Sequence, residues 1–346
     1  MSYQRRHALE TSGLKHEGGI TGALVSVVVC AYNNWPDLEM TIESALHQSH
    51  QPIEVIVVDN SSTDATPVEL QKHFGNLIKY ICQPNKGDAG AYNTGFAAAR
   101  GEYIQFVDGD DVLAPNKIQK QIDVFLANSD ADIVYGDIRH FQDAAGSPAW
   151  HDVATQPEND ILMEFIAPRN GWTGIGALGV LFRRRALEKV GPWDESLYIA
   201  DLDYWLRAAH AGCRFKHCAG SPMGFMRRHA RQMSADRSAM DRGREAVLEK
   251  ALGYINSEPY RARLAANLAE YKYRSAIARE PIGVSSALAK LKLARTTSPQ
   301  RVTALAYALG YAAITVPGGS FLAQLRPFGK VRGLFASLSG FHDDIQ

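Results

Sequence analysis

The sequence predicts an α/β fold with a mainly parallel central sheet, followed by a C-terminal helical extension. From residue 24 onward, short runs of β-branched residues alternate with stretches of helical periodicity. That order is typical of strands joined by crossover helices in a parallel sheet. After about residue 240 the strand-like runs fade, and alanine-rich segments of helical composition replace them.

Five runs along the chain have the composition of strands. They are rich in Val, Ile and aromatic residues, which suit a pleated surface. Turn-forming or polar residues bound most of them. The runs are VSVVVC (25–30), IEVIVVD (53–59), LIKYIC (77–82), EYIQFVD (102–108) and DIVYG (132–136).

Helical patterns separate these runs. After the first run, Pro36 suits a first helical turn, and the apolar residues Leu38, Ile42, Ala45 and Leu46 fall on one face. After the second, TPVE (66–69) matches a capping box with proline at the first helical position, so a helix is expected to begin there. Residues 114–128 predict another helix, with Ile118, Ile122, Phe125 and Leu126 at helical spacing. Later helices are expected at 243–254, 259–279, 283–295 and 299–313.

Composition argues against several classes of protein. The chain has 37 Lys and Arg against 37 Asp and Glu, so its net charge gives no reason to expect a nucleic-acid partner. Its four cysteines lack the C-x-x-C spacing of zinc and redox sites, which favours reduced thiols. Residues 1–23 contain charges and no continuous apolar run, so they predict a flexible tail rather than a secretory signal. The chain is therefore expected to be cytoplasmic.

A charge-free segment near the C-terminus raises a membrane question. Residues 302–325 run 24 positions without a charge, which is long enough to consider a membrane span. Pro317, Gly318 and Gly319 weaken a continuous helix there. Two alternatives stay open: helices packed against the protein, or a peripheral contact with the inner face of the plasma membrane.

Polar residues follow three of the predicted strands directly. They are the segments 31–34 (AYNN), 59–64 (DNSSTD) and 108–111 (DGDD). In an open α/β sheet the ligand site forms where the carboxyl ends of the strands meet the following loops. If the strands are parallel neighbours, these segments converge on one crevice although up to 80 residues separate them.

The segment 108–111 places three carboxylates within four residues. One aspartate at such a position is explained by a turn or a helix N-cap. Asp108, Asp110 and Asp111 together repel one another, and a divalent cation would offset that repulsion. Mg²⁺ and Mn²⁺ typically take one or two protein carboxylates together with substrate phosphate oxygens. The sequence therefore favours a site for Mg²⁺ or Mn²⁺ and a phosphate compound.

The usual phosphate-binding loops are missing from the sequence. No G-x-G-x-x-G follows the first strand, and G-x-x-x-x-G-K-[ST] does not occur. The phosphates are therefore expected to be held chiefly through the metal.

Four motifs, in this order, resemble the family 2 glycosyltransferases. They are VSVVVCAYNN, VIVVDNSSTDAT, NKGDAGAYNTGFAAARGEYIQFVDGDD and VGPWDESLYIADLDYWLRAA, and the resemblance covers about residues 24–235. It implies a single Rossmann-like nucleotide-diphospho-sugar transferase domain of the A-type glycosyltransferase fold. The expected division is a catalytic domain at 24–238 and an α-helical region at 239–346.

The resemblance also implies roles for residues in the first half of the chain. Asp59 accepts a hydrogen bond from the base, whose identity stays open among uracil, guanine and thymine. Asp108 serves the ribose or the metal surroundings, and Asp110 binds the metal directly. Asp111 is either an acid behind the metal or a helix cap, and Asp64 is expected to cap a helix. The further nucleotide-sugar-binding residues implied are Ala31, Tyr32, Asn33, Lys86 and Gly87.

In the second half, the segment IADLDYWLRAAHAG predicts a helix that begins near Asp201. The resemblance implies that Asp201 is the catalytic base, whereas its ordinary alternative is a helix cap and that of Asp203 a surface or first-turn charge. Ala200 stands where the family commonly has glutamate. In MRRHARQMS (226–234), His229 is implied as a ligand of the metal or the diphosphate, and Arg227, Arg228 or Arg231 as partners of phosphate. Trp172 and Trp193 are either acceptor-stacking or packing residues.

The function implied is an inverting, metal-dependent glycosyltransferase. It would move a sugar from a nucleotide-diphosphate sugar to a hydroxyl of a glycan or lipid-linked acceptor, in surface-polysaccharide biosynthesis. The alternative is a catalytically impaired nucleotide-sugar-binding or scaffolding protein of the same fold, which Ala200 motivates. A nucleotidyltransferase would need a Gly-rich basic loop after the first strand, and CAYNNWPD (30–37) is not one.

Overall fold

A computed structural model describes residues 22–141, 161–167, 175–229 and 232–278 of the chain. The expected tail (1–23) falls almost wholly outside these ranges, and so do the helices expected after residue 279 and the segment 302–325. Within the described ranges, no helix has both the length and the apolar composition that crossing a bilayer requires.

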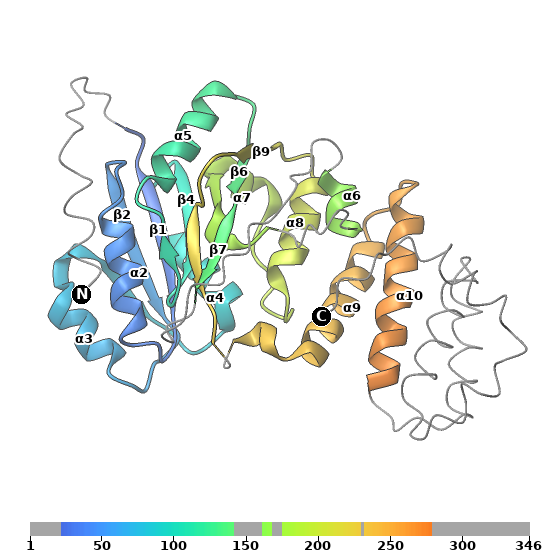
Figure 1. Ribbon diagram of the computed structural model, residues 1–346, viewed down its shortest axis with the longest axis horizontal. Coiled ribbons are helices and arrows are strands. Elements are labelled where there is room, and N and C mark those ends of the chain that lie inside the picture. The colour runs from blue at the N-terminus through green and yellow to red at the C-terminus, as the bar shows by residue number, and fades with distance from the viewer. Residues whose placement is uncertain (1–21, 142–160, 168–174, 230–231, 279–346) are drawn as a thin grey trace, which may run out of the picture.

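A seven-stranded, mainly parallel sheet forms the centre of the described structure, in the order β3-β2-β1-β4-β8-β6-β9 (Figure 1). β8 runs antiparallel to both its neighbours, and the other paired strands run parallel. The strands of this sheet are β1 (Val25–Ala31), β2 (Ile53–Asp59), β3 (Lys79–Cys82), β4 (Tyr103–Asp108), β6 (Ile133–Gly136), β8 (Val180–Arg183) and β9 (Phe215–Cys218). The α/β fold predicted from the sequence is confirmed.

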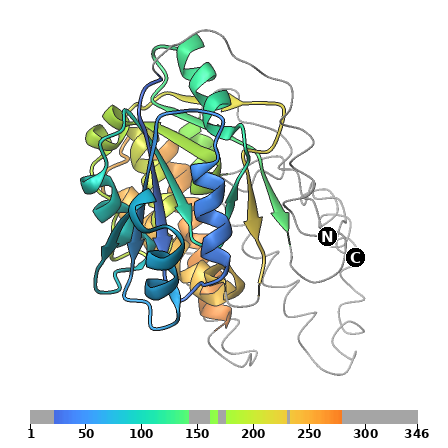
Figure 2. The same cartoon turned by 90° about the vertical axis from the view of Figure 1, so that its left-hand side faces the viewer.

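Helices pack on both faces of this sheet because its central strands are apolar on both sides. Along β1, Val25, Val27 and Val29 join one buried cluster with residues of α2 and α5. Val28 and Cys30 join the other cluster, with residues of α4 and α8. Figure 2 shows α2 lying alongside the strands. The helices are α2 (Asp37–Leu46), α3 (Thr66–His73), α4 (Gly87–Ala98), α5 (Lys117–Ala127), α6 (Ile161–Ile166), α7 (Arg184–Val190), α8 (Ala200–His210), α9 (Arg237–Leu252) and α10 (Tyr260–Ala278), with short 3₁₀ turns at Gly75–Leu77, Ala177–Gly179 and Met233–Ala235.

A second, three-stranded sheet has the order β5-β10-β7. β5 (Val112–Leu113) directly follows the DGDD segment, and β10 (Gly224–Arg227) directly precedes His229. β10 pairs antiparallel with β5 and parallel with β7 (Ile138–Phe141). This sheet therefore brings the end of the 226–229 segment back to the carboxylates that follow β4.

The C-terminal helices α9 and α10 share a core with the sheet domain. In Figure 1 they lie at the end of the molecule opposite α3, with α9 between α8 and α10. Val247 and Leu248 of α9 and Leu264 of α10 belong to the same buried cluster as Val28 of β1. The division at residue 238 remains a prediction, and α9 begins beside it, at Arg237.

The expected capping box at 66–69 is wrong. Thr66 is the first helical residue, and the preceding Ala65 makes no side-chain capping bond. Instead, the carboxylate of Asp64 accepts the Thr66 N–H at 3.0 Å. Asp64 therefore serves the start of the helix, as the sequence predicted. Farther along, the expected apolar face of α5 holds for Ile118, which is buried, but Leu126 is 69% exposed.

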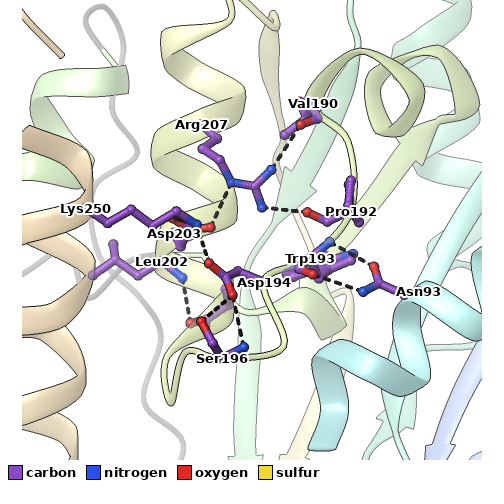
Figure 3. A network of polar contacts seen from close by, with 11 residues as sticks. Asn93, Val190, Pro192, Trp193, Asp194, Ser196, Leu202, Asp203, Arg207 and Lys250 are labelled. Atoms are coloured by element: carbon purple, nitrogen blue, oxygen red, sulfur yellow. Dashed lines mark hydrogen bonds and ion pairs between the residues drawn. The ribbon is translucent and has the colours of Figure 1, made fainter. Parts of the chain in front are cut away.

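Asp203 is a first-turn charge of α8, as one of its alternatives predicted, but it is buried and does not lie at the surface. It lies in the first turn of α8 with 0% exposure. Its two oxygens pair with Arg207 at 2.8 Å and with Lys250 of α9 at 2.8 Å, and Lys250 also reaches Asp194 at 2.7 Å (Figure 3). Arg207 further donates to the carbonyls of Val190 and Pro192. The network joins α8, α9 and the turn before α8.

We expect Asp203→Ala to lower the free energy of unfolding by about 3 kcal/mol, because it leaves Arg207, which is 18% exposed, and the more exposed Lys250 without their buried counter-charge. Urea denaturation followed by circular dichroism measures the change. Asp130→Ala is the matched control, since Asp130 pairs with Arg214 at the surface and 49% of its side chain is exposed. That variant should lose less than about 1 kcal/mol. Equal losses in the two variants would contradict a structural role for the buried pair.

Candidate functional site

Strand register brings three polar segments to one edge of the sheet. Ala31, at the end of β1, stands opposite Asp59 of β2, and Cys30 stands opposite Asp108 of β4. These strands are parallel neighbours, so the segments 31–34, 59–64 and 108–111 leave the sheet on the same side. The convergence expected from the sequence is therefore observed.

The first two segments are bound to each other. The side-chain oxygen of Asn33 accepts the N–H groups of Thr63 at 2.7 Å and Asp64 at 3.2 Å. In return, the Asn33 N–H donates to the Ser62 hydroxyl at 2.9 Å. Asn33 and Ser61 have φ of 51° and 59°, a left-handed backbone that asparagine tolerates better than most residues. Asn33 therefore shapes the loop, and Tyr32 beside it is left 50% exposed.

Asp59 lies behind this loop and not on its surface. Its carboxylate has 0% exposure, with one oxygen accepting from the N–H and hydroxyl of Ser62 at 2.8 and 2.6 Å. The other oxygen accepts the Tyr80 hydroxyl at 2.7 Å. In this conformation Asp59 orders its neighbours, and its bond to a nucleotide base stays a prediction.

The NKG turn reaches the same edge. Lys86 is exposed, while Gly87 has φ of 66°, a region open chiefly to glycine. The Gly87 carbonyl accepts from the Asn60 side chain at 3.1 Å, which ties the turn to the loop after β2. A Cβ on Gly90 would lie 2.3 Å from the Cβ of Lys86, so the close packing of this turn requires glycine at position 90 too.

Asp108 is half-buried among other carboxylates. Its oxygen accepts the Tyr92 hydroxyl at 2.5 Å. Burial, together with the charges of Asp88, Asp110 and Asp201, raises its pKa to about 8, against the lowering effect of the Tyr92 hydrogen bond. Asp201, which belongs to α8 and lies 93 residues later in the chain, is thus one of the charges that act on Asp108.

Asp110 and His229 meet across the two sheets. The His229 Nε2 and an oxygen of Asp110 are 2.9 Å apart, and the side chains are 24% and 33% exposed for Asp110 and His229. The Nδ1 of His229 is buried without a hydrogen-bond partner. Ligand atoms on neighbouring positions of an octahedral Mg²⁺ or Mn²⁺ ion lie about 3 Å apart, given bonds of about 2.1 Å. The spacing of this pair therefore fits two adjacent ligands of such an ion.

The described residues do not form a complete metal cage. Within them, no group of three or more His, Cys, Asp and Glu side chains is arranged to hold an ion. Mg²⁺ normally completes its shell with waters and substrate phosphates when protein ligands are few. The pair therefore suits a metal that binds together with a phosphate compound.

Gly109 is required by the close approach of two loops. A Cβ at this position would lie 2.1 Å from the Asn34 side-chain nitrogen and 2.7 Å from the Cys30 carbonyl. The DGDD segment can therefore lie against the end of β1 only with glycine here.

Asp111 and Arg227 hold the second sheet in place. Asp111 is 2% exposed and accepts the Arg227 N–H at 2.9 Å, while Asn116, not Asp111, precedes α5 as its N-cap. The helix-cap alternative for Asp111 is therefore wrong. The Arg227 side chain is also buried, donates to the Asp110 carbonyl at 3.0 Å and lies 3.4 Å from the Asp37 carboxylate. Its expected role as a phosphate partner is wrong, because its charge is already engaged inside the protein.

Asp201 lies in the first turn of α8, after Ile199, which makes no side-chain capping bond. Its oxygen accepts the adjacent Leu202 N–H at 2.7 Å. Burial raises the pKa of Asp201, while the Leu202 N–H and the charge of Arg244 lower it and the charge of Asp88 raises it. A carboxylate with a raised pKa that stays partly accessible is a stronger base than an ordinary aspartate and is suited to accept a proton.

Asp88 also lies at this edge, although no separate reason to select it was found in the sequence. It lies in the first turn of α4, and its carboxylate accepts the Cys30 thiol at 3.2 Å. The residue is exposed, but the surrounding protein desolvates its carboxylate, and this together with the charge of Asp110 raises its pKa. The NKG turn directly before Asp88 and the position of β1 in the sheet place it here, and the position of β1 is not visible in the residues around Asp88.

Trp193 is a packing residue. It is 4% exposed and stacks on Tyr204 with ring centroids 4.0 Å apart. Its backbone N–H and carbonyl both pair with the Asn93 side chain (Figure 3). Trp172, the other candidate for stacking on the acceptor, and Arg231, a candidate partner of phosphate, lie outside the described residues.

We expect added Mn²⁺ to raise the melting temperature more at pH 8 than at pH 6. Because the folded pKa of Asp108, about 8, exceeds its unfolded value of about 4, the proton on Asp108 stabilises the fold at low pH. That contribution is lost as pH rises from about 4 through 8, where a divalent ion can replace the proton. Thermal melts with and without Mn²⁺ measure the difference. Asp108→Asn is the control that should remove the pH dependence, and equal gains at both pH values would contradict the assignment.

Three comparisons relate this chain to known proteins. Residues 26–191 match the family model described as glycosyl transferase family 2. An uncharacterized glycosyltransferase of Nostoc sp. is 36% identical over 177 residues, 49% of this chain and 54% of that protein. The succinoglycan biosynthesis protein ExoO of Rhizobium meliloti is 31% identical over 226 residues, 62% of each chain. The matches thus span about half to three fifths of these relatives' lengths.

Two solved structures have a similar fold. S. aureus TarS 1-349 in complex with UDP-GlcNAc aligns with a TM-score of 0.58 and 18% identity, over 81% of this chain and 83% of that one. The mannosyltransferase PcManGT from Pyrobaculum calidifontis, in complex with GDP-Man and Mn²⁺, aligns with a TM-score of 0.53 and 17% identity, over 97% and 93%. At these identities the likeness is one of fold.

Proposed function

We propose, from the match of residues 26–191 to the glycosyl transferase family 2 model, that the chain transfers one sugar from a nucleotide-diphosphate sugar to an acceptor hydroxyl with inversion. The observation that carries the proposal is the meeting of Asp110 and His229, 2.9 Å apart, at the edge of the sheet where Asp108 ends β4. The charge of Asp201, on α8, acts on Asp108 and supports a basic carboxylate beside this pair. A donor diphosphate and an acceptor hydroxyl need those two elements side by side.

The donor half of the site is supported by the loops after β1, β2 and β4. The exposed ring of Tyr32 offers a surface on which a nucleotide base can stack. Asn33, Asp59 and Ser62 hold that loop in shape through their mutual hydrogen bonds. We assign Ala31, Tyr32, Asn33, Asp59, Lys86, Gly87 and Asp108 to nucleotide-sugar binding.

We assign Asp110 and His229 as the metal ligands. A bound Mg²⁺ or Mn²⁺ would neutralise the charge that develops on the departing diphosphate. The 2.9 Å separation of the two ligand atoms supports this assignment. PcManGT, which shares the fold, binds GDP-Man together with Mn²⁺.

We assign Asp201 as the catalytic base. Its carboxylate takes the proton of the acceptor hydroxyl as that oxygen attacks the anomeric carbon, and the glycosidic bond to the diphosphate breaks. One carboxylate suffices for an inverting transfer, because attack and departure occur on opposite faces of the sugar in a single displacement. The raised pKa of Asp201 supports this role, because it makes the carboxylate a stronger base than an ordinary aspartate.

We propose a glycan or lipid-linked glycan as the acceptor, in the assembly of a surface polysaccharide at the cytoplasmic side of the membrane. The likeness to a succinoglycan biosynthesis protein supports the polysaccharide setting. The donor base and sugar are left to experiment.

A panel of UDP-, GDP- and dTDP-sugars, with and without Mn²⁺, tests the proposal. We expect one donor to raise the melting temperature in a Mn²⁺-dependent way, and the same donor to be consumed when a matching acceptor is present. The competing function is nucleotide-sugar binding without turnover, which Ala200 at the start of α8 motivates. Donor binding without transfer or hydrolysis across a broad acceptor panel would favour that alternative, and absence of any donor binding would refute both.

A further inference from the structure

Two exposed apolar side chains belong to the segments that carry the proposed base and the proposed metal ligand. Tyr198, three positions before Asp201, is 38% exposed, and Met233, four positions after His229, is 48% exposed. The Tyr198 hydroxyl donates to the Met233 carbonyl at 3.1 Å. One hydrogen bond therefore joins the base-bearing segment directly to the metal-binding segment.

The backbone of Tyr198 is anchored from the inside of the protein. Ile199, the next residue and the last before α8, is buried in the main core. Gly243 of α9 packs behind Tyr198, since a Cβ added at Gly243 would lie 3.4 Å from the Tyr198 Cβ. Tyr198 is thus held at both ends, by its backbone and by its hydroxyl, while part of its surface stays open to solvent.

Hydrogen bonds of the backbone fix the position of Met233. Its carbonyl also accepts the Asp236 N–H at 3.3 Å, and the Gln232 N–H donates to the His229 carbonyl at 3.3 Å. Asp236 in turn caps α9 by accepting the Ala239 N–H at 2.9 Å. The place of Met233 close to His229 therefore does not depend on the Met233 side chain, which stays exposed.

An exposed tyrosine held in this way gains little stability from its position. Fixing its rotamer costs conformational entropy, and its hydroxyl only exchanges a bond with water for a bond with a carbonyl. Burial of the aromatic ring, which normally offsets such costs, is incomplete here. A rigid aromatic ring with exposed surface loses little further entropy on binding, and tyrosine is common at recognition sites for that reason.

A sugar has the chemistry that complements such a ring. A pyranose has an apolar face of C–H groups and hydroxyls around its rim, so it can lie against an aromatic ring while its hydroxyls stay hydrogen-bonded. The acceptor must bring one hydroxyl to Asp201, and Tyr198 stands three residues before that carboxylate. The donor is assigned to other segments, the loops after β1, β2 and β4 and the NKG turn. The surface at Tyr198 is therefore placed for the acceptor.

We propose that Tyr198 and Met233 form the acceptor subsite, which takes a sugar residue of the acceptor glycan. The Tyr198 ring lies against the C–H face of that sugar, the flexible Met233 side chain covers its edge, and one hydroxyl is left directed at Asp201. The inference rests on the proposed function for the role of Asp201 as base, and it deepens that function by naming acceptor-binding residues. The hydrogen bond between the two segments does not depend on it.

Steady-state transfer kinetics test the subsite. Tyr198→Ala is expected to raise the acceptor KM about tenfold, because the ring contact and its anchor are both lost, while kcat and the donor KM stay within about twofold. Tyr198→Phe keeps the ring and loses only the bond to Met233, so its acceptor KM should rise less, by about threefold. Met233→Ala keeps the carbonyl and therefore that bond, so a similar rise of about threefold would report the side chain alone.

Val68→Ala is the matched control for removing an exposed apolar side chain. Val68 is 68% exposed on α3, at the end of the molecule opposite α9 (Figure 1), and its loss should leave all kinetic constants at the parent values. Equal rises of the donor and acceptor KM in Tyr198→Ala, together with a lower melting temperature, would mark a structural role and overturn the subsite. An unchanged acceptor KM would also overturn it and would leave the proposed transfer intact.

Saturation-transfer difference NMR separates the subsite from the proposed reaction, because it needs no turnover. The probes are p-nitrophenyl glycosides of the common hexoses, added with Mn²⁺ and UDP, GDP or dTDP and without a sugar donor. At least one glycoside should bind the parent protein, and Tyr198→Ala should bind it about tenfold more weakly. That loss in a chain that transfers no sugar would support the subsite and refute the proposed transfer. Glycosides that bind both proteins equally, or neither, would overturn the subsite.

Discussion

Asp201→Asn is expected to lower kcat by about a thousandfold, with donor binding retained. Asparagine has nearly the size of aspartate and can still accept the Leu202 N–H, but it cannot take up the proton of an attacking hydroxyl. General-base catalysis typically contributes 10²- to 10⁴-fold. Steady-state transfer kinetics with the donor identified by thermal stabilisation, together with a donor-binding titration, measures the two quantities separately.

The control for this substitution is Asp123→Asn, an exposed aspartate on α5 whose partner is Gln119. That variant should keep parent kinetics. Transfer by Asp201→Asn at the parent rate would remove Asp201 from the role of base, even if the protein proves to be a glycosyltransferase. A loss of donor binding equal to the loss of kcat would instead place Asp201 on the donor side.

Asp110→Asn is expected to abolish both Mn²⁺-dependent donor binding and transfer. The substitution removes the charged oxygen that stands 2.9 Å from His229, and a neutral amide is a weaker ligand for a hard divalent ion. Calorimetric titration of donor with and without Mn²⁺ gives the affinity, and transfer assays give the rate. In the parent protein, a chelator such as EDTA should reproduce the loss, and added Mn²⁺ should reverse it.

His229→Ala measures how much the histidine contributes to metal affinity, separately from the charge of Asp110. We expect a smaller loss of metal affinity, on the order of 10- to 100-fold, because the carboxylate and the donor phosphates remain. Asp64→Asn is a control for the loss of a carboxylate near the site, since Asp64 serves the start of α3. Donor binding and transfer that are insensitive to EDTA would contradict the metal assignment and leave the fold assignment intact.

The sheet was predictable because each of its central strands has a recognisable local composition. β1, β2 and β4 are short runs rich in β-branched residues, and polar residues lie at or directly after their ends. The helical segments between the runs predict that the strands are parallel. The convergence of Asp59, Asp108 and Asp110 at one edge follows from that order alone. The failed capping box at 66–69 marks the limit of such reasoning, because Asp64 and Thr66 both suit a helix start and the loop geometry decides between them.

Charges far apart in sequence were the least predictable feature. The position of Arg227 close to His229 suggests an arginine that binds phosphate. In the structure, β10 pairs with β5, and the Arg227 side chain is buried inside the protein. Asp203 reads as a solvent-facing residue of an amphipathic helix, and the packing of α9 on α8 buries it against Lys250. Asp88 carried no local signal at all and gains its place from the Cys30 thiol across the sheet.

The amino-acid sequence by itself determined the α/β class, the polar strand ends and the identity of the carboxylates that gather there. These depend on periodicity and on side-chain chemistry, which are properties of short stretches. Only the tertiary structure decided which charges are paired and which are buried, as Arg227 and Asp203 illustrate. The reason is physical: the energy of a charge depends on the dielectric and the counter-charges around it, and those are supplied by segments that the chain brings together only when it folds.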